Sequence, residues 1–142
     1  MQIPGLRSPH EKVGTLVYFG RMLDKIKLHA AGKLPADYIP NLGEGFDKAC
    51  IQLLGLKYGA VVERVKQGGT DEEILAWCRE HGRPLIDQDL HVWNEFMRKR
   101  GWNDSASQRL KERKAEAGIS QRDEIQTFFD FIDADEGRPF AG

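Results

Sequence analysis

The stretch YFGRMLDKIKLHAAGKLPADY, residues 18–38, carries the strongest evidence about how this chain folds. Shortly before it, Ser8 opens the sequence Ser-Pro-His-Glu, which has the pattern of a capping box with proline in the first helical position. Glycine is the usual residue just beyond a helix, and Gly32 occupies that place. These signals together predict one long helix over Pro9–Ala31.

This first helix is expected to lie at the centre of the fold. On a helical wheel its apolar residues cover an arc of about 200°, which is wider than the stripe of roughly 100° that a surface helix shows. Two charged residues, Asp24 and Lys27, fall inside the arc and are close enough along the helix to form an ion pair. Arg21 lies at the edge of the same arc.

Two interpretations of these charges remain open at this point. In the first, Asp24 pairs with Lys27 or Arg21 and only specifies the fold, because an unpaired buried charge costs several kcal/mol. In the second, cations of this helix bind an anionic ligand, and a carboxylate orients them. The second interpretation predicts a charged pocket beside the first helix, and its expected lining residues are Tyr18, Arg21, Asp24, Lys27, His29 and Tyr38.

Further start and stop signals predict the remaining helices. Thr70 begins a second capping box, and its helix is expected to end at Gly82. The other expected helices are Asp87–Arg100, Asp104 or Ser105 to Gly118, Ser120 to about Ala134, and two short ones within 45–55 and 57–69. Because no segment alternates for long with a period of two, the predicted fold is all-α: a compact single-domain bundle of about seven helices over residues 1–142.

The composition excludes several classes of protein. A formal net charge of −1 argues against a general nucleic-acid or membrane-surface binder, since both usually carry a basic excess. Cys50 and Cys78 lie far apart and suggest no disulfide framework. No apolar run approaches the roughly 20 residues of a membrane span, and the N-terminal residues lack the apolar core of a signal peptide. We therefore expect a cytoplasmic protein with reduced cysteines.

Two further groups of residues have side chains that can form a metal site or a nucleic-acid site. Cys78 and His81 share a face of the 70–82 helix, but a structural zinc site needs four ligands and no other ligand has a motif spacing, so no metal is predicted. The segment 95–116 is rich in arginine and lysine, with acids interleaved. This interleaving is typical of a solvated helix with surface ion pairs and disfavours binding of nucleic acid.

The C-terminal part combines an apolar helix face with a cluster of acids. Asp130, Asp133, Asp135 and Glu136 gather at the helix end that prefers cations. We expect compensation by basic residues elsewhere, from segment 95–116 or from Arg21 and Lys25, or by a divalent cation; otherwise the helix end is solvated.

Five long motifs in this chain resemble a bacterial family known as domain of unknown function 5069. They are IPGLRSPHEKVG, LVYFGRMLDKIKLHAAGKLPADY, VKQGGTDEEILAWC, WNEFMRKRGW and FFDFIDADEGR, and they extend from Ile3 to Arg138. The resemblance implies a small single-domain bacterial cytosolic protein. It implies no activity, so it supplies no catalytic residues, and whether the chain is an enzyme, and with which cofactor, stays open.

Two functions are therefore expected as alternatives. The first is binding of a small anionic ligand in the charged pocket beside the first helix. The second is a non-enzymatic protein–protein interaction module, which would use the basic face Arg98–Lys114 or the acidic C-terminal residues.

Overall fold

The computed structural model describes residues 2–140; Met1 and residues 141–142, which belong to the predicted domain, lie outside the described residues. The described part contains seven α-helices: α1 Phe19–Ala30, α2 Phe46–Leu54, α3 Tyr58–Lys66, α4 Asp71–His81, α5 Asp87–Lys99, α6 Ser107–Glu116 and α7 Phe128–Asp135. It also contains the 3₁₀-helix η1 Ala36–Asn41 and two short strands, β1 Lys12–Val13 and β2 Leu16–Val17. The prediction of an all-α fold is confirmed.

The prediction that the first helix begins at Pro9 is wrong. Residues 12–17 form a small antiparallel hairpin, in which Lys12 pairs with Val17 and Val13 with Leu16. Gly14 in its turn has a φ of 59°, a conformation that glycine adopts readily. The hairpin buries Val13, Leu16 and Val17 in the core, and this tertiary packing outweighs the local helix signal.

Ser8 does not cap a helix. Its Oγ accepts a hydrogen bond from the backbone N–H of His10 and donates one to Asp133 of α7. The Ser-Pro-His-Glu pattern therefore makes a local turn whose hydroxyl has a partner from a distant part of the chain.

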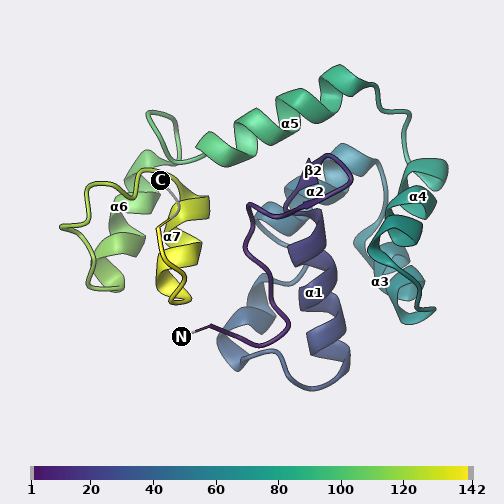
Figure 1. The fold of residues 1–142 in the computed structure, drawn as a ribbon, viewed down its shortest axis with the longest axis horizontal. Helices are drawn as coiled ribbons and strands as arrows, with labels where there is room; N and C mark the ends of the chain where they lie inside the picture. The colour runs from purple at the N-terminus through teal and green to yellow at the C-terminus, as the bar shows by residue number, and fades with distance from the viewer. Residues whose placement is uncertain (1, 141–142) are drawn as a thin grey trace.

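Helix α1 nevertheless lies at the centre of the larger part of the molecule, as expected (Figure 1). All residues from Phe19 to Ile26 are buried. The helix contacts α3 and β1, and α5 runs across the molecule with contacts to β2 and α7. The indole N–H of Trp93 on α5 donates to the backbone carbonyl of Val17, which fastens α5 to the hairpin.

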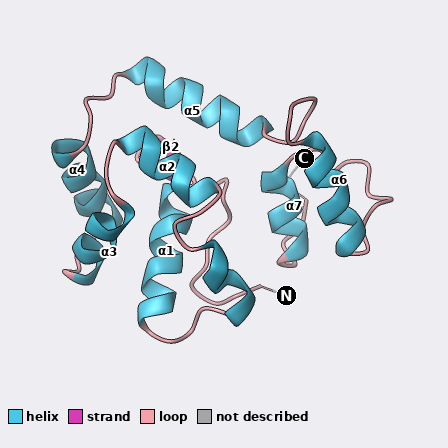
Figure 2. Cartoon of the chain, turned by 180° about the vertical axis from the view of Figure 1, so that it is seen from behind, coloured by secondary structure: helices cyan, strands magenta, loops and turns pink. Residues whose placement is uncertain are grey.

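Helix α7 belongs to two apolar clusters. Phe129 packs in the main core with residues of α1, α2 and α5, whereas Phe131 packs in a smaller cluster with Leu110 of α6 and Ile125. Figure 2 shows α6 and α7 next to each other, beyond the end of α5. Helix α7 therefore joins the α6 region to the main core.

The other helix boundaries follow their caps. The capping box at Thr70 is confirmed, with hydrogen bonds in both directions to Glu73. Helix α7 begins at Phe128 instead of Ser120, because the hydroxyl of Thr127 accepts the N–H of Asp130. Helix α6 begins at Ser107, later than expected, because the carboxylate of Asp104 accepts from backbone N–H groups in the preceding turn.

A pair of glycine substitutions tests this packing. At Gly82, which ends α4, a Cβ atom would overlap the carbonyl oxygen of Leu54 and lie 2.8 Å from that of Cys78. We expect Gly82→Ala to lower the free energy of unfolding by about 1–3 kcal/mol or more, because neither backbone can yield easily. Urea denaturation monitored by circular dichroism measures this change.

Gly59 is the matched control. It lies in α3, and a Cβ atom there meets nothing within 4 Å. Gly59→Ala should raise the free energy of unfolding by about 0.5–1 kcal/mol through helix propensity. Equal effects of the two substitutions would contradict the close approach of α4 to Leu54.

Candidate functional site

A pocket of about 560 Å³ lies between α1, η1 and α2 on one side and α5, α6 and α7 on the other. This volume is within the range of small-molecule sites. Among the predicted site residues, Tyr18, Arg21 and Tyr38 line the pocket. Asp24, Lys27 and His29 do not line it. Asp24 and Lys27 have ion-pair partners that the sequence did not indicate.

The expected pairing of Asp24 with Lys27 or Arg21 is wrong. Asp24 is buried and accepts hydrogen bonds from Arg7, whose Nε lies 2.8 Å from its Oδ2. Lys27 is 44% exposed and pairs with Asp71 of α4 at 3.3 Å. Arg7 also contacts Asp71, at 2.7 Å, so it links the two carboxylates.

Gly20 explains why Arg7 reaches Asp24. A Cβ atom at Gly20 would lie 2.8 Å from Cζ of Arg7, so the bare glycine surface lets the guanidinium lie across α1. The small residue beside the charges thus makes room for a partner from the N-terminal segment. His29, in the last turn of α1, is exposed.

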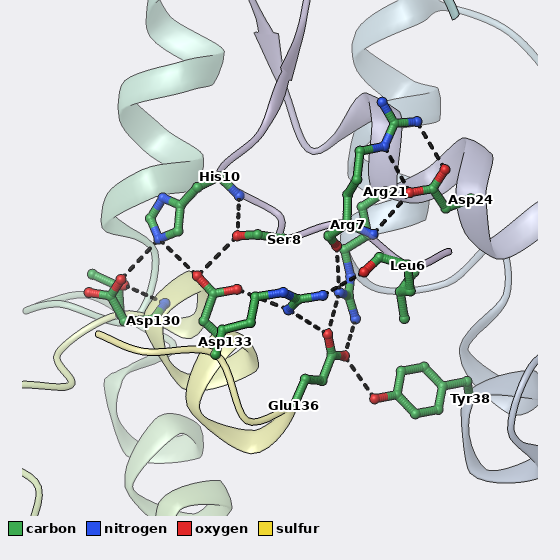
Figure 3. Close-up of polar contacts among 12 residues, drawn as sticks. Leu6, Arg7, Ser8, His10, Arg21, Asp24, Tyr38, Asp130, Asp133 and Glu136 are labelled. Atoms are coloured by element: carbon green, nitrogen blue, oxygen red, sulfur yellow. Dashed lines mark hydrogen bonds and ion pairs between the residues drawn. The ribbon is translucent and has the colours of Figure 1, made fainter. Parts of the chain in front are cut away.

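Arg21 and Tyr38 converge on Glu136, just after α7 (Figure 3). The guanidinium of Arg21 binds both carboxylate oxygens, at 2.9 and 2.6 Å, and the hydroxyl of Tyr38 donates at 2.7 Å. Glu136 is only 3% exposed. Burial by itself raises the pKa of Glu136, but the hydrogen bond and charge of Arg21 outweigh it, so the pKa is below the ordinary 4.5.

The acids at the end of α7 are compensated by basic residues, as expected. Arg21, one of the expected cations, pairs with Glu136, whereas the other partners come from the N-terminal segment and Arg138. Asp130 contacts the ring of His10 at 2.9 Å, and Asp133 accepts from Ser8 (Figure 3). Arg138 pairs with Asp133 and Glu136 and also donates to the carbonyl of Leu6. The segment before the hairpin is therefore fastened to α7.

A second buried cluster, Tyr18–Asp47–Lys25, was missed by the sequence analysis. Asp47 has no exposed surface; it accepts from the hydroxyl of Tyr18 at 2.6 Å, from Nζ of Lys25 at 3.1 Å and from the N–H of Gly43 at 3.0 Å. Tyr18 and Lys25 both line the pocket.

One sequence signal could have revealed this cluster. Asp47 shares a face of its short helix with Cys50, Ile51 and Leu54, which are buried, and a carboxylate on an apolar face requires a partner.

The cluster has perturbed acid–base properties and a strained backbone. Burial lowers the pKa of Lys25 below the ordinary 10.5, although Asp47 opposes the shift, and burial together with Asp47 raises the pKa of Tyr18. Tyr18 has a φ of 71°, which for a residue other than glycine costs about 1–3 kcal/mol. Strain and shifted pKa values gather at functional sites more often than elsewhere.

The remaining candidates are placed differently. Cys78 is in the core, and His81 stacks on Trp77 with a ring-centroid distance of 4.5 Å. Within residues 2–140, no group of three or more histidines, cysteines, aspartates or glutamates is arranged to hold a metal ion. On the basic face, Arg98 and Lys99 pair with Glu95.

Comparison with protein families gives a match over nearly the whole chain. A family model described as Domain of unknown function (DUF5069) matches residues 3–138. No curated protein matches the sequence significantly. Among the described residues, no helix has both the length and the apolar character needed to cross a membrane.

Glu136→Gln tests the pairing with Arg21 through its pH dependence. A carboxylate with a lowered pKa stabilises the native state above its unfolded pKa, and this contribution is lost as the pH falls through the folded value. The wild type should therefore lose stability as the pH falls below about 4.5. Glu136→Gln should be less stable at neutral pH by about 3–5 kcal/mol, because Arg21 stays buried without a charged partner there. Its free energy of unfolding should also fall less steeply than that of the wild type as the pH is lowered.

Urea denaturation between pH 7 and pH 3 measures both effects. Glu80 is exposed and serves as the control; Glu80→Gln should change the stability by no more than about 0.5 kcal/mol. If the free energy of unfolding of Glu136→Gln falls as steeply with decreasing pH as that of the wild type, Glu136 is not the titrating group.

Proposed function

We propose that this chain, which belongs to the DUF5069 family, binds a small molecule with one anionic group and an apolar body. The observation that carries the proposal is the distribution of side chains in the pocket of about 560 Å³. Aromatic rings and cations make much of its lining, and three exposed acids belong to the lining as well. A ligand with a single negative charge fits this arrangement.

The apolar part of the ligand would contact phenylalanines. The rings that line the pocket come from α2, α5 and α7, and they are Phe46, Phe96, Phe128 and Phe131. Phe46 packs edge-on against Phe128 at 5.9 Å, which fixes one wall. Phe96 is 52% exposed, so a bound apolar group would remove a large ring from water and gain about 25 cal/mol for each Å² buried.

The anionic part would contact arginines. Arg100 lies over the ring of Phe96, with Cζ 5.4 Å from the centroid, and Arg113 lies over Phe131 at 5.5 Å. Their side chains are 27% and 41% exposed, and their ion pairs with Asp104 and Glu116 are at 3.2 and 3.6 Å. Both guanidiniums can therefore offer donors to a carboxylate or phosphate that enters the pocket.

The acids of the pocket favour ligands with little negative charge. Asp37, Glu44 and Asp135 line the pocket and are exposed. Each would repel a second anionic group near it. Glu136, the buried acid of the lining, is already bound by Arg21.

The alternative function, an interaction module that uses the basic face Arg98–Lys114, has less support. Most cations of this face have ion-pair partners on their own helix or the following turn. Lys114 is buried and donates to the backbone carbonyls of Arg122 and Ile125. Apart from Arg100 and Arg113, which line the pocket, this face therefore offers little free positive charge to an acidic partner.

A location in the bacterial cytoplasm is part of the proposal. Cys50 and Cys78 are both buried and free, which suits a reducing compartment.

A thermal-shift screen of aromatic and branched-chain monocarboxylates and monophosphates tests the proposed function. A ligand that binds only the native state raises Tm by mass action. For a ligand found in this way, we expect Arg113→Gln to weaken binding by about 1.5–3 kcal/mol, or roughly 10- to 100-fold in Kd, because one charge-assisted hydrogen bond is lost. Isothermal titration calorimetry measures the Kd.

Arg109→Gln is the matched control on the same helix. Arg109 also pairs with Glu116 but is not among the lining residues, so its substitution should leave the Kd within about twofold. Equal losses in the two variants, or a screen in which no monoanion raises Tm, would refute binding in this pocket.

A further inference from the structure

Lys25 is placed where its amine can reach a bound molecule. It lines the pocket from the buried face of α1, and its side chain is 7% exposed. Within the described part of the chain, its Nζ donates a hydrogen bond to Asp47. The other buried lysine, Lys114, donates to two backbone carbonyls and does not line this pocket.

Burial shifts Lys25 toward its neutral, nucleophilic form. Burial lowers its pKa, although the charge and hydrogen bond of Asp47 oppose this shift, and aromatic rings form part of the pocket that Lys25 lines. Desolvation in an apolar pocket is one of the ways in which proteins activate a lysine as a nucleophile. The arrangement also includes a base, since Oδ2 of Asp47 lies 3.1 Å from Nζ.

A proton path leads away from this amine. The other carboxylate oxygen of Asp47 accepts from the hydroxyl of Tyr18 at 2.6 Å, and Tyr18 lines the pocket. Nζ, the carboxylate and the hydroxyl thus form a continuous chain from the nucleophile to a group that can face the substrate. Such an arrangement of a nucleophile, a base and a third polar group is a recurrent feature of covalent catalysis.

We infer that Lys25 forms an imine with small aldehydes or ketones that carry one anionic group and an apolar body. The inference rests on the proposed function and names the reactive class of its ligand. Asp47 first takes a proton from the ammonium. The amine lone pair then forms a C–N bond to the carbonyl carbon, while the π pair of the carbonyl moves to its oxygen.

The rest of the reaction balances without an oxidant or a further reactant. Tyr18 gives a proton to the oxygen and regains one from Asp47. The carbinolamine nitrogen then loses a second proton to Asp47, which passes it through Tyr18 to the hydroxyl oxygen. The nitrogen lone pair forms the C=N bond while the C–O bond breaks, and the oxygen leaves as water. Carbonyl compound and ammonium have become protonated imine and water, two of the three ammonium hydrogens are in the water, and Asp47 is again a carboxylate.

Reductive trapping on the full wild-type chain tests this inference. The probe is para-carboxybenzaldehyde, which has one ring, one carboxylate and one aldehyde, and sodium cyanoborohydride reduces any imine to a stable amine. Peptide mapping by mass spectrometry gives the labelled positions. We expect Lys25 to be labelled several-fold faster than Lys48, which is exposed on α2, and Lys114 to stay unlabelled.

Lys25→Arg provides the second measurement, since it removes the primary amine and keeps a cation beside Asp47. It should lose the fast labelling and retain the slow labelling of surface lysines. Labelling of wild-type Lys25 no faster than that of Lys48 would overturn the inference, whether or not this variant folds.

An unreactive analogue separates this inference from the proposed function. para-Toluate has the same ring and carboxylate, with a methyl group in place of the aldehyde. A rise in Tm with para-toluate but no fast labelling of Lys25 would refute the imine and leave anion binding intact. If para-toluate does not raise Tm and Lys25 is not labelled fast, both the imine and the proposed anion binding are refuted. Fast labelling that para-toluate suppresses would support both.

Discussion

The fold depends on one constraint: its central helix buries charged side chains, and each of them needs a partner. Arg21, Asp24 and Lys25 are all less than a tenth exposed, and their partners are Glu136, Arg7 and Asp47. Removing one partner from a buried ion pair costs about 3–5 kcal/mol, although the pair itself adds little net stability. The charges of α1 therefore restrict which arrangements of the other elements are possible.

Each pair fixes a different element against α1. Arg7 brings in the N-terminal segment, Asp47 orients α2, and Glu136 places the end of α7. Helix α7 is further fastened by Phe129 in the main core and by contacts of its acids with Ser8 and His10. The acidic helix end, which is unfavourable in isolation, becomes the docking point of the N-terminal segment.

The pocket follows from the same arrangement. Arg21 and Lys25 point toward the place where α1 faces α6 and α7, and the aromatic residues of α2, α5 and α7 make its other walls. The buried carboxylates keep these cations in position, while Arg100 and Arg113 stay half-exposed. The strained φ of Tyr18 lies at the start of α1, where the hairpin turns into the helix and the hydroxyl reaches Asp47.

The sequence by itself determined the helical class of the fold, the burial of α1 and the capping box at Thr70. Such features depend on periodicity and on contacts three or four residues apart, which a sequence displays directly. Tertiary structure alone decided that residues 12–17 form a hairpin and that Lys25, not Lys27, faces the pocket. It also chose the partners of Asp24 and Lys25, which lie 17 and 22 positions away. For Arg21 it selected Glu136, 115 positions away, from the acidic cluster that the sequence had offered. A local pattern shows that a buried charge needs a partner, but only the packing of distant elements determines which residue meets it.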